Sequence, residues 1–105
     1  METVRINSDD YWVKVVEMLQ QNWALVDLVE QSSAQVYFIS DGSGVFDQLT
    51  FPSAADAEAG LRKNGFRRFS ENRDLQEFLR PPQAPFRRSV HPNGPIYSSG
   101  RFWRE

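Results

Sequence analysis

The stretch from Ala34 to Phe69 constrains the fold of this chain more than any other. Two runs rich in β-branched and aromatic residues, 35–40 and 45–51, flank the turn sequence Asp41–Gly44. An Asp-Gly pair between two such runs is a strong short-range signal for a β-hairpin. The second run leads directly to a helix start at Ser53, so the stretch predicts strand, turn, strand and helix in succession.

The predicted helix covers residues 54–63. Ser53 precedes it with a hydroxyl that can accept a backbone N–H, and Asp56 follows three residues later as in a capping box. Arg62 lies in the last turn, where a cation complements the helix dipole. Gly65 lies just beyond the end, where a left-handed residue commonly closes a helix.

Three further elements complete the prediction. Residues 9–21 place apolar side chains at i, i+3, i+4 and i+7, the pattern of an amphipathic helix capped by Ser8. Residues 23–30 are apolar at both odd and even positions except for Asp27, which suits a strand with both faces at least partly covered. Residues 71–79 predict a short helix that ends before Pro81.

These elements predict an α+β fold in a single domain. We expect a small antiparallel meander of three to four strands with two to three helices packed on it. Residues 1–80 form this core, and residues 81–105 are a proline-rich, irregular segment of the same domain, rich in arginine and aromatic residues. That segment is too apolar for a solvated linker, so we expect it to be partly docked over the other face or an edge of the sheet.

Composition excludes several classes of function. The chain has no cysteine, which rules out disulfides, thiolate metal sites and cysteine nucleophiles. No apolar stretch approaches the roughly 18–20 residues that a membrane-spanning helix needs. The N-terminus lacks the basic and apolar regions of a secretory signal, so we expect a cytoplasmic protein without a membrane partner.

Charge is divided unevenly along the chain. Residues 1–60 carry two cations and ten acids, whereas residues 61–105 carry ten cations and four acids. Such a division indicates either an anionic partner or electrostatic self-association. It is equally compatible with a basic half that folds back and pairs with the acidic half inside the molecule.

Catalytic and metal-binding patterns are missing from the sequence. The single histidine, His91, lies in a turn-prone loop, and no nucleophile motif surrounds any serine. Histidine and carboxylate residues do not show metal-ligand spacing. The run Gly42–Gly44 leads into a strand and not into a helix, which argues against a phosphate-binding loop. We therefore expect no catalytic residue, no cofactor and no metal.

Arginine next to aromatic residues is the sharpest functional pattern, and it recurs at 66–69, 86–88 and 101–104. These residue types are enriched at protein interfaces, so we predict a protein-interaction module or self-associating domain. Single-stranded nucleic acid is the alternative, since phosphates bind arginine and bases stack on rings, although the pI of about 5.4 counts against it. An enzyme using His91 ranks third. The predicted binding residues are Phe86, Arg87, Arg88, Tyr97, Arg101, Trp103 and Arg104.

Overall fold

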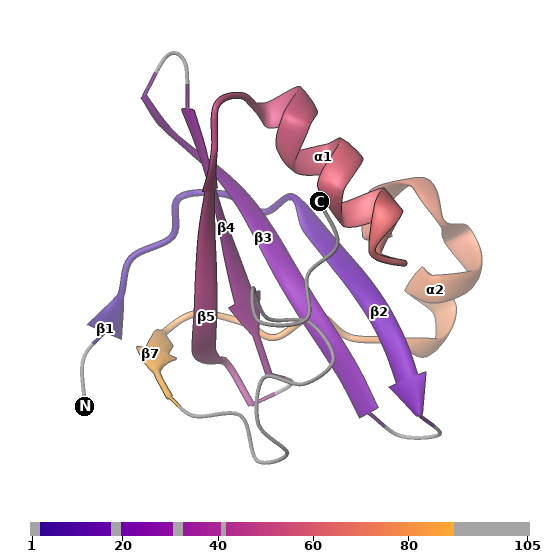
Figure 1. Ribbon diagram of the computed structural model, residues 1–105. Helices are drawn as coiled ribbons and strands as arrows, with labels where there is room; N and C mark the ends of the chain where they lie inside the picture. The colour runs from indigo at the N-terminus through magenta and orange to yellow at the C-terminus, as the bar shows by residue number, and fades with distance from the viewer. Residues whose placement is uncertain (1–2, 18–19, 31–32, 41, 90–105) are drawn as a thin grey trace.

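The computed structural model describes residues 3–17, 20–30, 33–40 and 42–89, which form one seven-stranded sheet and two α-helices (Figure 1). The strand order is β1-β7-β5-β4-β3-β2-β6, and every neighbouring pair is antiparallel except β5 with β7. The chain is α+β as predicted, but the expected antiparallel sheet of three to four strands is wrong. The elements are β1 (Thr3–Val4), β2 (Tyr11–Glu17), β3 (Gln20–Glu30), β4 (Ser33–Ile39), β5 (Gly44–Phe51), α1 (Ala54–Lys63), β6 (Arg67–Arg68), the 3-10 turn η1 (Phe69–Glu71), α2 (Arg73–Phe78) and β7 (Phe86–Arg88).

The predicted helix at 9–21 is the largest error. Most of this segment forms β2 and the beginning of β3, which pair from Tyr11↔Leu25 to Glu17↔Gln20. Its valines are β-branched and favour a strand, because a helix restricts their side-chain rotamers. Trp12 and Val13 are both buried, in the cores on opposite faces of the sheet. When a strand is buried on both faces, its apolar residues no longer alternate with polar ones, and their spacing can resemble that of an amphipathic helix.

The central meander and the first helix agree with the prediction. Strands β3, β4 and β5 follow one another through antiparallel pairs, and α1 occupies residues 54–63. The Ser53 hydroxyl accepts the Asp56 backbone N–H at 3.1 Å, which confirms the predicted cap. Gly65 has φ +87°, the left-handed conformation expected after the helix. The second helix, Arg73–Phe78, is shorter than the predicted 71–79, because Glu71 belongs to η1 and both Asn72 and Leu79 are extended.

Two short strands extend the meander at its edges. Strand β6 pairs with β2 opposite Trp12 and Val13. Strand β7 lies between β1, which it meets antiparallel, and β5, which it meets parallel. Each is only two or three residues long, too short to give a recognisable alternation in the sequence. Together with β1 and β2 they account for the difference between the predicted and the observed sheet.

The chain after β5 wraps around the sheet. Helix α1 covers one face, and the chain then reaches the far edge at β6 (Figure 1). The segment after α2 returns across the opposite face to β7, and the Tyr11 hydroxyl on β2 donates to the carbonyl of Pro82 in this segment at 2.6 Å. This path explains why the sheet is covered on both sides.

Strand β3 divides its side chains between two cores. Ala24 and Val26 belong to the core beneath α1, whereas Trp23 and Leu25 belong to the core on the other face. That second core is completed by Phe86 and by half-buried side chains of η1 and α2. We predicted that the segment 81–105 supplies this cover, and Phe86 of that segment belongs to the second core, whereas residues 90–105 lie outside the described part of the chain. Among the described residues, no helix is long and apolar enough to cross a membrane.

Candidate functional site

Strand β7 carries the three predicted binding residues that the structure describes. Phe86 is buried with 4% of its surface exposed and belongs to the second core. Since side chains alternate along a strand, Arg87 projects from the opposite side of β7 and is exposed. Arg88 lies on the same side of β7 as Phe86 and is half-buried. Burial raises the pKa of the Tyr37 phenol, and the nearby charge of Arg88 opposes this rise without cancelling it. The other predicted site residues lie outside the described part of the chain: Tyr97, Arg101, Trp103 and Arg104, and with them His91.

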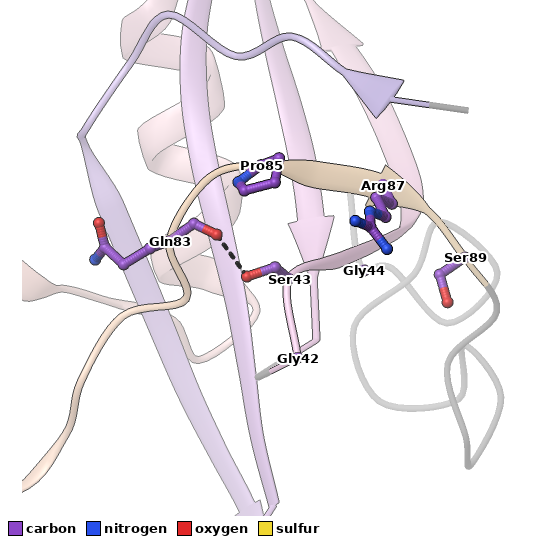
Figure 2. Close-up of a pocket in the computed structure, with 7 residues that line it drawn as sticks. All are labelled: Gly42, Ser43, Gly44, Gln83, Pro85, Arg87 and Ser89. Atoms are coloured by element: carbon purple, nitrogen blue, oxygen red, sulfur yellow. Dashed lines mark hydrogen bonds between the residues drawn. The ribbon is translucent and has the colours of Figure 1, made fainter. Parts of the chain in front are cut away.

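A hollow of about 370 Å³ adjoins Arg87. It lies between the turn that joins β4 to β5 and the strand β7, so it brings together residues more than forty positions apart. Figure 2 shows the side chains of Arg87, on β7, and of Ser89, just after this strand, beside the Gly42–Gly44 turn. The lining residues are Gly42, Ser43, Gly44, Gln83, Pro85, Arg87 and Ser89.

Backbone contacts fix the walls of this hollow. The Arg87 N–H donates to the Ser43 carbonyl at 3.1 Å, and the Ser43 hydroxyl donates to the Gln83 carbonyl at 2.7 Å (Figure 2). Ser43 has φ +67°, so the left-handed residue of the turn is this serine and not a glycine. Gly44 is required for contact with β7, because a Cβ there would lie 2.7 Å from the Ser89 Cβ. Hydrogen bonds therefore join the hairpin and β7 into one frame.

Arg87 differs from the arginines of the 66–69 motif in its electrostatic surroundings. Among the described residues, no carboxylate forms an ion pair with Arg87. In contrast, Arg67 lies 3.4 Å from Asp74, and Arg68 lies 2.8 Å from Asp10. An exposed guanidinium on a rigid strand presents several N–H donors in a planar fork, which suits a carboxylate or a phosphate.

The 66–69 motif has a structural role. Arg68 bonds Asp10 and also approaches Glu58 and Glu71 at 3.4 and 3.5 Å, and the bond to Asp10 is the main cause of its raised pKa. Its guanidinium lies 5.4 Å from the centre of the Trp12 ring, within cation–π range. Part of the charge division along the sequence is thus balanced by pairing inside the molecule, one of the three interpretations that the sequence allowed.

A second hollow, of about 520 Å³, was not predicted from the sequence. It lies where the segment before β2, the second half of β3, α1 and β6 meet. Asp27 is the one sequence signal for it, as an acid that interrupts an apolar strand. Asp27 is buried, and its Oδ2 accepts the Asn7 backbone N–H at 3.1 Å. The lining residues are Asn7, Ser8, Asp10, Val26, Asp27, Leu28, Ala54, Glu58 and Arg68.

No family model, no curated protein and no solved structure matches this chain at a significant level. Among the described residues, the two hollows at Arg87 and Asp27 have charged walls. No group of three or more histidine and carboxylate side chains among the described residues is arranged to hold a metal ion. The hollow at Arg87 offers a cation and hydroxyl groups, and the hollow at Asp27 offers carboxylates. Both are suited to recognise a charged group of a partner.

Proposed function

We propose that this chain is a protein-interaction module that binds an acidic segment of a partner beside Arg87. The observation that carries the proposal is an exposed guanidinium, without an ion pair among the described residues, at the rim of a hollow of about 370 Å³. A glutamate or aspartate of the partner accepts two N–H bonds from such a guanidinium.

The position of Arg87 on a strand that is paired on both sides supports this function. Strand β7 is held by β1 on one side, through Thr3↔Arg87, and by β5 on the other, through Gly44↔Arg87. A backbone fixed on both sides leaves only the side chain to be ordered when a partner binds. This lowers the entropic cost of association, which is a large share of what any interface must overcome.

The described residues favour a protein partner over single-stranded nucleic acid. Binding of nucleic acid combines arginine with exposed rings on which bases stack. Phe86, the aromatic residue next to Arg87, is directed into the second core and offers no stacking surface. The arginines at 67 and 68 are engaged by acidic side chains. An enzyme that uses His91 remains the third proposal.

Fluorescence anisotropy of a labelled, glutamate-rich peptide tests the proposal. We expect saturable binding at low ionic strength, and we expect Arg87→Ala to weaken it by about tenfold, as the loss of a charged hydrogen bond implies. Arg73→Ala is the matched control, because Arg73 is also exposed but lies on α2. This control should bind the peptide like the unmodified protein.

A second titration, with labelled oligouridine, separates the proposal from its alternative. Binding of RNA that is tighter than peptide binding and falls steeply with salt would favour nucleic acid. Equal peptide affinity in the Arg87→Ala and Arg73→Ala variants would show that Arg87 is not part of the binding surface.

A further inference from the structure

Strand β3 continues beyond the end of its partner β2. The last paired residues of the two strands are Tyr11 and Leu25. One more contact follows, in which the Val26 N–H donates to the Asp10 carbonyl at 3.4 Å. Strand β3 runs on to Glu30 and is paired on its other side with β4, through Leu28↔Ala34 and Glu30↔Ser33. The second half of β3 therefore has an edge facing away from β4.

Leu28 presents its backbone at this edge. Backbone groups in an antiparallel strand alternate between the two sides, and the Val26 N–H is directed toward β2. Two residues later, Leu28 directs its N–H and C=O to the same side, where no described residue pairs with them. Its side chain is 66% exposed, which is unusual among the leucines that the structure describes. An open edge beside an exposed apolar side chain is a template for another strand.

The second hollow adjoins this edge and has acidic walls. Three carboxylates line it, those of Asp10, Asp27 and Glu58, against the single guanidinium of Arg68. Arg68 is bonded to Asp10 at 2.8 and 3.0 Å, and a single guanidinium cannot balance three carboxylates. The Asp27 side chain is buried, and a charge in such a place interacts more strongly with a neighbour than a charge in open solvent does.

We propose that this edge of β3 binds an extended, basic segment of a partner protein by strand addition. The partner backbone bonds the N–H and C=O of Leu28, an apolar side chain packs on the leucine, and an arginine or lysine enters the acidic hollow. Backbone pairing supplies affinity for an extended segment, and the carboxylates select its charge.

This surface is separate from the one proposed at Arg87. Leu28 is level with Ala34 at the beginning of β4, whereas the Arg87 hollow adjoins the turn after the end of β4. The two surfaces also differ in the sign of their charge. Variants at either surface therefore test it without disturbing the other.

The test uses a fluorescein-labelled peptide that alternates valine and arginine. We expect saturable binding by anisotropy, and we expect Leu28→Lys to weaken it at least tenfold, because the new cation repels the peptide and removes the apolar contact. Phe78→Lys is the matched control, since Phe78 is, among the described residues, the other large hydrophobic residue that is exposed, at 81%, and it lies on α2. Circular dichroism verifies that both variants are folded. The control and Arg87→Ala should both bind like the unmodified protein.

Two further measurements examine the backbone pairing and the charge. The Leu28 amide should shift in the NMR spectrum and exchange with solvent more slowly when the peptide is bound. A peptide N-methylated at alternate residues, which lacks the N–H donors of one side, should bind at least tenfold more weakly, and so should a peptide with glutamate in place of arginine. The proposal is overturned if the valine–arginine peptide does not bind, if N-methylation has no effect, or if Leu28→Lys matches Phe78→Lys.

Discussion

Arg68 holds Asp10 with two hydrogen bonds, of 2.8 Å from Nε and 3.0 Å from Nη2, across 58 positions of sequence. The pair connects the edge strand β6 to the segment that enters β2. The Arg68 guanidinium also lies over the Trp12 ring of β2. A strand of two residues offers few ladder bonds, so these side-chain contacts supply much of what keeps β6 at the edge.

Arg68→Lys should lower the free energy of unfolding by about 1–2 kcal/mol, because lysine cannot form the paired bonds of a guanidinium. The control is Arg67→Lys, whose side chain is 52% exposed and whose ion pair with Asp74 is longer, at 3.4 Å. An exposed pair of this kind contributes at most about 1 kcal/mol. Urea unfolding measures both changes, and equal values for the two variants would contradict the structural role of Arg68.

The Tyr11 hydroxyl should make stability depend on alkaline pH. Burial disfavours the phenolate and the carboxylate of Asp9 adds to this, so the pKa of Tyr11 is raised above its usual value of 10.0. A raised pKa means that its stabilising contribution is complete below about pH 10 and is lost as pH rises through the folded-state pKa. Tyr11→Phe removes both this dependence and the bond to Pro82.

Tyr11→Phe is therefore expected to lower the free energy of unfolding by about 1 kcal/mol near neutral pH, the value of a typical buried hydrogen bond. The difference between the variant and the unmodified protein should shrink above about pH 10, since only the latter loses stability through this phenol. Urea unfolding at several pH values measures it. A difference that stays constant up to the end of the alkaline range would show that Tyr11 does not titrate differently in the folded state.

The fold could be predicted where local signals and tertiary structure agree. Helix α1 has a cap at Ser53 and a terminator at Gly65, and both are confirmed. The prediction for residues 9–21 was wrong because Trp12 and Val13 are buried on opposite faces of the sheet. This removes the alternation of apolar and polar residues that identifies a strand. Burial on both faces follows from the later chain wrapping around the sheet, and a window of neighbouring residues does not contain that information.

The candidate site was predictable only in part. Arg87 was predicted from the arginine–aromatic pattern of the sequence. That its side chain projects on the side of β7 opposite to Phe86 and Arg88 depends on β7 being a strand between β1 and β5. The acidic hollow depends on four segments that meet in space, so only Asp27 gave a signal along the sequence.

We expect Asn22 to lower the free energy of unfolding, and one substitution should remove this effect. It is fully buried on β3, and neither its Nδ2 nor its Oδ1 has a hydrogen-bond partner in the part of the chain that the structure describes. Burial of an unpaired amide costs about 1–3 kcal/mol, so Asn22→Leu, which has a similar volume, should raise the free energy of unfolding by about 1–2 kcal/mol. Asn64→Leu is the contrasting control, because the Asn64 Nδ2 donates to the Gly60 carbonyl at 2.9 Å.

Urea unfolding compares the two asparagine variants. A gain in stability for Asn22→Leu and a loss for Asn64→Leu support the assignment. If Asn22→Leu is destabilised by more than about 1 kcal/mol, then the amide has a partner such as a buried water, which the leucine cannot replace.

Gly44 should be indispensable to the frame of the Arg87 hollow, whereas Gly42 should not. A Cβ at Gly44 would lie 2.7 Å from the Ser89 Cβ and 3.2 Å from the Ser40 Oγ, so Gly44→Ala forces β7 away from β5 at the point where the two strands pair. We expect a loss of about 1–3 kcal/mol, the usual cost of forcing extra volume into a packed site. At Gly42, apart from its chain neighbours, no atom of the described residues lies within 4 Å of the corresponding position, so Gly42→Ala should change stability by less than about 0.5 kcal/mol.

The variants Gly44→Ala and Gly42→Ala also test whether the frame formed by the hairpin and β7 supports peptide binding. Arg87 lies on β7 directly opposite Gly44. Displacement of the strand in Gly44→Ala should therefore also weaken binding of the glutamate-rich peptide, while Gly42→Ala should bind it like the unmodified protein. Thermal unfolding and peptide anisotropy on the same samples separate the two effects, with binding measured well below the midpoint of unfolding. If Gly44→Ala lost stability but bound the peptide normally, the guanidinium would act independently of the hollow. The binding surface would then be centred on the Arg87 side chain and not on the frame formed by the turn.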